Sequence, residues 1–185
     1  MHRRTAVNIR RMPNRLPALL IRDCAIAAVT VALWMWTLRT GPAHDAATVM
    51  LHLGTALMTV LSGYLVHEWG HLLGAYYRGS VVHLPETPLA AFLFRFDTGR
   101  NSREQFLAMS LGGFISSAIA VAVLFLLLPW ELLASKVALA LVVLGVVATF
   151  ILEVPSALKV YRGAAMPQGA AFVAGNPEHQ PESTT

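Results

Sequence analysis

Charged residues and cysteine are both scarce in this sequence. Only 13% of the 185 residues are charged and 56% are hydrophobic, with a mean hydropathy of +0.58. This is far more apolar than a soluble domain of this length needs. Cys24 is the only cysteine, which excludes an internal disulfide and a cysteine-based metal cluster. The composition therefore predicts an integral membrane protein.

The net charge of +4 comes largely from arginines near the N-terminus. They are Arg3, Arg4, Arg10, Arg11, Arg15 and Arg22. Such a run can bind nucleic acid, but beside a membrane span it more simply keeps that end of the chain in the cytoplasm. We therefore expect a basic cytoplasmic tail over residues 1–15, and no nucleic-acid partner.

Four long apolar stretches predict an all-α membrane protein with about four transmembrane helices. They run from about 16 or 24 to 38, from 48 to 77, from 106 to 128 and from 132 to 158. Loops rich and poor in Lys and Arg alternate, which predicts that both termini are cytoplasmic. We expect a membrane domain over 16–162, with its core at about 47–162. Residues 163–185 are rich in Pro, Gly and small polar residues and predict a disordered cytoplasmic tail.

The loop between the second and third spans predicts a small β-hairpin. Val81-Val82 and the alternating run 92–96 favour two short strands, with residues 85–88 turning between them. Because this loop is so apolar, we expect the hairpin to lie at the cytoplasmic face of the membrane or to dip into it. Ser102 is expected to cap the helix that follows.

The second span contains the motif His67-Glu68-Trp69-Gly70-His71, of the form H-E-x-x-H. Residues four apart share a helix face, so both imidazoles can reach one metal ion while Glu68 lies beside them. Histidines and carboxylates are expensive in hydrocarbon, which favours a functional site. The alternative is a polar cluster that joins helices or relays protons. His52 lies about four turns earlier and is expected to be a helix-contact residue.

A catalytic zinc needs a third protein ligand, and Glu153 is our candidate. His71 and Glu153 each lie about six residues from the cytoplasmic end of their spans, so both are expected about 9 Å below the same surface. Pro155 is expected to unravel the helix and turn the Glu153 carboxylate toward the metal. Alternatively, Glu153 reaches the interface or pairs with an arginine. His83 and Asp97 are weaker ligand candidates.

Over residues 60–160 the order of motifs resembles the site-2 protease family of intramembrane zinc metalloproteases. The resemblance is carried by "HEWGH" in a membrane helix, by "FRFDTGRNSREQFLAMSLGG" and by "LGGFISSAIA". It implies a three-helix metalloprotease core with a membrane-associated β-hairpin. It also implies substrate contacts from the Gly-rich motif, here Gly112 and Ser116 or Ser117. The same small residues also suit close helix packing, which can coexist with a role in the site.

The fourth span departs from the family pattern. The family supplies its third ligand as an aspartate in an Asn-Pro…Asp-Gly stretch, whereas this chain reads "FILEVPSALKVYRG" and has no aspartate after Asp97. Either Glu153 takes the place of that aspartate, or the site is altered.

The sequence thus predicts an intramembrane zinc metalloendopeptidase with one zinc ion bound by His67, His71 and Glu153. Glu68 is expected to activate the water that attacks a peptide bond. The expected partners are the lipid bilayer and a transmembrane protein or peptide substrate, and the expected location is the bacterial inner membrane. The alternative is a non-proteolytic membrane protein that keeps the fold and uses the histidines for metal binding or regulation.

Overall fold

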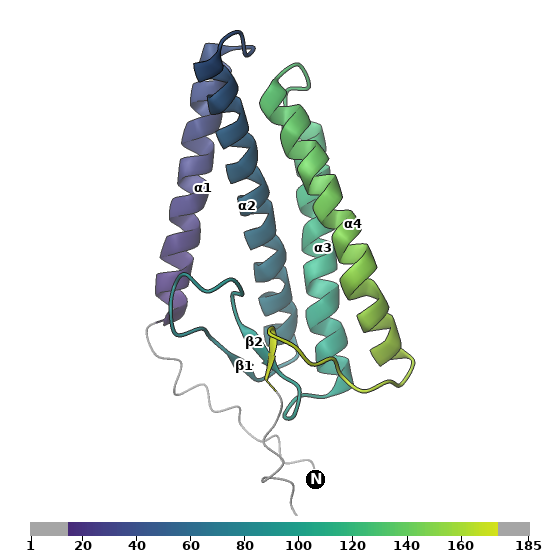
Figure 1. The fold of residues 1–185 in the computed structure, drawn as a ribbon. Helices are drawn as coiled ribbons and strands as arrows, with labels where there is room; N and C mark the ends of the chain where they lie inside the picture. The colour runs from purple at the N-terminus through teal and green to yellow at the C-terminus, as the bar shows by residue number, and fades with distance from the viewer. Residues whose placement is uncertain (1–14, 174–185) are drawn as a thin grey trace, which may run out of the picture.

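Four long helices make up most of the chain (Figure 1). This computed structural model describes residues 15–173. The helices are α1 (Arg15–Thr40), α2 (Ala46–Tyr77), α3 (Arg103–Leu127) and α4 (Leu133–Tyr161). The strands are β1 (Val82–His83), β2 (Arg95–Asp97) and β3 (Phe172–Val173). The predicted basic tail of residues 1–15 lies outside the described residues except for Arg15, where α1 begins.

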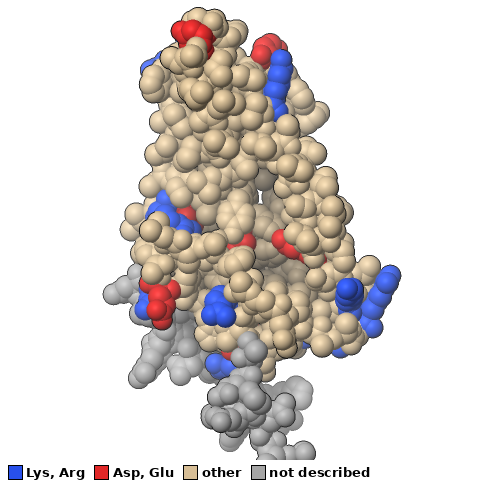
Figure 2. Space-filling view, in the orientation of Figure 1, with Lys and Arg blue, Asp and Glu red and all other residues tan. Residues whose placement is uncertain are grey.

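Each of the four helices is long and apolar enough to cross a membrane. Their outward faces carry exposed apolar side chains, such as Ile21 on α1, Leu73 on α2, Leu126 on α3 and Ile151 on α4. Figure 2 shows a broad uncharged band below the upper end of the molecule, with charged side chains at that end and over the lower half. A helix satisfies its own backbone hydrogen bonds, so such a surface suits contact with lipid. The fold therefore agrees with the predicted set of four candidate spans.

Side chains cap the helices where the chain enters them. Asp45 caps α2 in a capping box with Thr48, and Ser102 caps α3 in a capping box with Gln105. The Ser102 cap confirms the prediction from sequence. Each box satisfies two backbone N–H groups that the first turn leaves without a partner.

His52 caps α4 from a different helix. Its imidazole is fully buried, and Nδ1 accepts the backbone N–H of Ala134, in the first turn of α4, at 3.1 Å. Its Nε2 donates to the carbonyl oxygen of Gly41 in the α1–α2 loop. No side chain at the N-cap position of α4 makes this bond. His52 is therefore a helix-contact residue, as expected, at the end of the bundle away from the HEWGH motif.

A three-stranded sheet lies at the end of the bundle where α2 ends and α3 begins (Figure 1). β1 and β2 pair antiparallel, with Val82 opposite Phe96. The strands begin one to three residues later than the expected 81–82 and 92–96. The connecting loop reaches back along the helices, since Tyr64 donates its hydroxyl to the carbonyl oxygen of Ala91 at 2.7 Å. Tyr64 lies about 20 Å along α2 from its end at Tyr77, so this loop covers several turns of the helix.

The third strand comes from the segment that we expected to be disordered. After α4 the chain turns back, and β3 pairs parallel to β2, with Phe96 opposite Phe172. The Pro and Gly content that suggested disorder forms turns here, at Gly163 and Gly169, both of which have positive φ. The apolar pair Phe172-Val173 then forms β3, the third strand of the sheet. The remainder of the predicted tail, residues 174–185, lies outside the described residues.

Candidate metal centre

His67 and His71 lie on one face of α2 with their Nε2 atoms 3.0 Å apart. Two ligands bound at about 2.0–2.1 Å to a tetrahedral zinc ion lie about 3.3 Å from each other. The spacing of the two histidines is therefore close to that of a zinc site. It follows directly from their separation by four residues on a regular helix.

Carbonyl groups of α3 fix which nitrogen of each ring faces the partner histidine. His71 Nδ1 lies 2.9 Å from the carbonyl oxygen of Met109, and His67 Nδ1 lies 3.2 Å from that of Gly113 and 2.7 Å from Ser117 Oγ. A carbonyl only accepts hydrogen bonds, so each neutral ring carries its proton on Nδ1. Both Nε2 atoms then present lone pairs to the same point.

Glu153 of α4 completes this arrangement. One carboxylate oxygen lies 3.4 Å from His67 Nε2 and the other lies 3.3 Å from His71 Nε2. In the described part of the chain, these three residues form the group whose ligand atoms all lie within 4.8 Å of one another. Two lone pairs and a carboxylate repel one another unless a cation lies among them. A single proton bridges two of the three acceptors, whereas a metal ion contacts all of them.

Pro155 does not unravel α4, contrary to our expectation. The helix continues to Tyr161, and Pro155 lies within it. A proline removes one backbone hydrogen bond, and the remaining bonds of a long helix hold the segment in place. Glu153 therefore points at the histidines because of its position on a regular helix.

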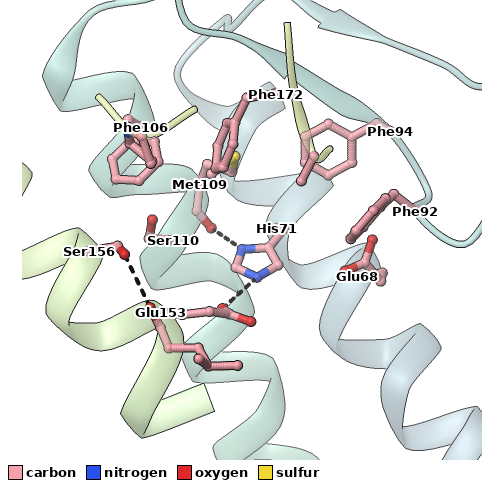
Figure 3. Close-up of a pocket in the computed structure, with 13 residues that line it drawn as sticks. Glu68, His71, Phe92, Phe94, Phe106, Met109, Ser110, Glu153, Ser156 and Phe172 are labelled. Atoms are coloured by element: carbon pink, nitrogen blue, oxygen red, sulfur yellow. Dashed lines mark hydrogen bonds and ion pairs between the residues drawn. The ribbon is translucent and has the colours of Figure 1, made fainter. Parts of the chain in front are cut away.

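Glu68 lies beside the ligand set rather than within it. Its side chain is buried, and Oε2 accepts the backbone N–H of Leu93 at 3.1 Å. Figure 3 shows its carboxylate facing the same cavity as His71 and Glu153. A carboxylate next to a metal site, and held by a backbone donor, is placed to take a proton from water there.

The cavity in front of these groups has a volume of about 280 Å³. Its walls are mostly apolar and come from α2, α3, α4, the hairpin loop and the segment after α4. The lining residues are Glu68, His71, Phe92, Phe94, Phe106, Met109, Ser110, Leu152, Glu153, Ser156, Pro167, Ala171 and Phe172. Such a chamber can hold a peptide segment and admit water next to a buried carboxylate.

Glycines let α3 approach the histidine helix closely. A side chain at Gly113 would collide with the His71 ring, and one at Gly112 would collide with the backbone of Gly70. A side chain at Gly74 would collide with the backbone of Ala108. The carbonyls that hold the histidine rings reach them only because these positions lack a Cβ.

The residues of the predicted Gly-rich motif contact α2 and do not line the cavity with Glu68. Gly112 and Ser116 lie against Gly70, and Ser117 hydrogen-bonds His67. These contacts match the packing alternative for the motif. Ser117 in addition hydrogen-bonds the candidate ligand His67, a contact that its sequence position did not reveal.

The weaker ligand candidates pair with each other. His83 Nε2 lies 2.9 Å from a carboxylate oxygen of Asp97 across β1 and β2, and neither residue belongs to the group of converging ligand atoms. Trp69, on the opposite side of α2 from the site, donates its ring N–H to Asp23 of α1 at 2.8 Å. This hydrogen bond joins α2 to α1.

Several residues of the site were missed from the sequence. Ser110 and Ser156 bring hydroxyl groups to the cavity, and Phe172 closes one side of it (Figure 3). The available signals were weak: two isolated serines in apolar spans and an apolar pair in a Gly- and Pro-rich tail.

No protein-family model, curated protein or solved structure matches this chain.

Proposed function

We propose that this protein is an intramembrane zinc endopeptidase of the site-2 protease type, which hydrolyses a peptide bond of a membrane-spanning substrate. One observation carries the proposal: two Nε2 lone pairs and the Glu153 carboxylate converge on one point beside the buried Glu68. Metal binding alone gives no reason for a second carboxylate at that place.

The donor set suits zinc. Two imidazoles and one glutamate are a ligand set used by catalytic zinc sites, which keep a further position open for water or substrate. The carbonyl groups behind both rings are the outer-shell partners that such ligands need. When bound, zinc polarises a carbonyl group and lowers the pKa of water. His67, His71 and Glu153 would hold the ion.

Glu68 performs the proton transfers in this proposal. As the water oxygen forms a bond with the scissile carbonyl carbon, Glu68 takes the water proton. It then donates that proton to the amide nitrogen and the carbon–nitrogen bond breaks. The products are a carboxylic acid and an amine, and transfer of the acid proton to the amine gives a carboxylate and an ammonium group. The Leu93 N–H holds the Glu68 side chain in position for both transfers.

The substrate must be extended where it is cut, because a helix in lipid has every carbonyl tied up in its own hydrogen bonds. The aromatic cavity and the small sheet beside it offer apolar contacts and strand pairing to such a segment. In this proposal the site opens to the cytoplasmic side of the bacterial inner membrane and both termini are cytoplasmic.

Purified protein in lipid nanodiscs tests this function. Zinc content and cleavage of a model single-span substrate are measured for wild type, Glu68→Gln and the control Glu131→Gln, which changes an exposed carboxylate in the loop between α3 and α4. We expect Glu68→Gln to keep zinc and to lose at least about 1000-fold in cleavage rate, as losses of a catalytic acid–base do. The control should keep both.

A second candidate is a metal-binding membrane protein without protease activity. It is favoured by the third ligand, because Glu153 stands where the family pattern has an aspartate. Zinc bound by wild type without Glu68-dependent cleavage of any substrate would support this candidate and contradict the protease.

A further inference from the structure

The segment that follows α4 returns to the sheet and fills one edge of β2. The backbone N–H groups of Phe96 and Thr98 donate to the carbonyl oxygens of Ala171 and Val173 at 3.0 and 2.9 Å. Arg95 adds a side-chain bond to the carbonyl oxygen of Phe172 at 3.0 Å. Figure 1 shows β3 beside β2, with β1 on the other side. In the described chain, β2 therefore has a strand on both of its edges.

The same segment also forms a wall of the metal-site cavity. Pro167, Ala171 and Phe172 line it together with Glu68 and Glu153. Figure 3 shows the Phe172 ring over Met109, between Phe106 and Phe94. The ring centroids of Phe172 and Phe106 are 6.1 Å apart.

β2 is the natural place for an extended peptide to pair near the metal site. The residues just before it carry the Leu93 N–H that holds Glu68, and Phe92 and Phe94 line the cavity. A peptide that pairs with β2 on the cavity side would thus run past Glu68. That pairing needs the Phe96 and Thr98 donors that β3 already uses.

The contact is small enough to be exchanged. β3 has two residues, and both are only half-buried. Because the segment belongs to the same chain, its effective concentration at β2 is nevertheless high, and any incoming peptide must compete with it.

We propose that residues 164–173 occupy the edge of β2 at which an extended substrate segment pairs. Residues 164–173 must therefore leave this edge before substrate binds. The inference rests on the proposed function for the identity of the competing ligand. It also assigns a substrate feature: a large apolar side chain enters the place of Phe172, against Phe106 and Met109.

The test separates occupation of the edge from catalysis. Two variants detach β3: Phe172→Asp puts a charge into the aromatic contact, and Val173→Pro disfavours strand pairing without adding a charge. Phe172→Leu is the matched control that keeps an apolar side chain. All are prepared as full chains in nanodiscs, with Glu68→Gln present to prevent cleavage.

Hydrogen exchange at the Phe96 and Thr98 amides is measured first. We expect slow exchange in the parent and Phe172→Leu proteins and at least about tenfold faster exchange in both detached variants, because these amides lose their acceptors. Equal exchange in all four proteins would show that β3 does not occupy the edge.

Binding of a dye-labelled synthetic peptide with the sequence of residues 164–178 is measured second. We expect at least about tenfold tighter binding to the detached variants than to the parent, since a site occupied within the chain has a lower apparent affinity. Equal binding to all four proteins would overturn the inference. Absence of cleavage in proteins with Glu68 intact would count against the proposed function, whereas the exchange and binding results decide the inference.

Discussion

A single methyl group at Gly113 should disable the proposed metal site without replacing any of its ligands. In Gly113→Ala the new Cβ would overlap the ring of His71. Carbon atoms pack at about 3.5–4.0 Å, so the ring must retreat by about 1 Å. The ring is held by a hydrogen bond from its Nδ1 to Met109, on the same helix as the new methyl group. It therefore cannot retreat without losing that bond.

The magnitude follows from the precision that a metal site requires. Ligand distances in such sites hold to about 0.2 Å, so a displacement of about 1 Å removes His71 from the ligand set. We expect zinc affinity to fall at least about 100-fold, or about 2.7 kcal/mol. Overpacking should also lower the free energy of unfolding by about 1–3 kcal/mol.

Gly145→Ala is the matched control, because a Cβ at Gly145 of α4 would meet no atom within 4 Å. Zinc affinity is measured by competition with a chelator of known affinity in nanodiscs. Wild-type affinity in the control and a large loss in Gly113→Ala are expected. If Gly113→Ala binds zinc as tightly as Gly145→Ala does, close approach of α3 does not position His71, and the argument for the site geometry fails.

Two further substitutions test other parts of the structure. Glu153→Ala should weaken zinc binding at least about 100-fold, since one of three ligands is lost. The control Glu131→Ala should leave zinc binding unchanged. If Glu153→Ala also binds zinc as wild type does, Glu153 is excluded as a ligand. His52→Ala should lower the free energy of unfolding by about 2–4 kcal/mol, as measured by denaturant unfolding, because a buried side chain is removed and the Ala134 N–H and the Gly41 carbonyl oxygen lose their partner. The control is His44→Ala, because the His44 side chain is 68% exposed. If His52→Ala lowers the free energy of unfolding no more than His44→Ala does, the capping role of His52 is contradicted.

The candidate metal site and the contact between α2 and α3 are one structural feature. The glycines that bring α3 close to α2 also bring its carbonyls within reach of both Nδ1 atoms. Polar backbone groups of a helix interior rarely accept a second hydrogen bond from another helix, because side chains keep the helices apart. Here the absence of side chains at Gly112 and Gly113 makes that bond available, and the bond sets the tautomer that metal binding needs.

Rules that use only neighbouring residues were sufficient to predict the candidate spans and the placing of the two histidines on one helix face. Hydropathy alone predicted four helices, since a chain that crosses hydrocarbon must hide its backbone in long apolar helices. The four-residue spacing of His67 and His71 placed both rings on one face, as the structure shows. The approach of Glu153 was inferred from depth in the membrane, and the structure brings it within 3.4 Å of both rings.

Local rules failed where the outcome depends on distant contacts. Pro155 was expected to break α4, and it does not, because the rest of a long helix outweighs one lost hydrogen bond. The composition of residues 163–173 predicted a disordered tail. Instead, Phe172 and Val173 of this segment pair with the edge of β2. Composition describes a segment by itself and carries no information about an acceptor far away in the sequence.

The sequence by itself determined the number of candidate spans and which residues are candidates to bind a metal, because hydropathy and helical periodicity are properties of neighbouring residues. Only the tertiary structure decided that Glu153 joins the histidines, that α3 carbonyls orient both rings, and that β3 lies in the cavity wall. These three features depend on distances between helices. Such distances are set by which positions lack a side chain at each crossing, and no local pattern specifies them.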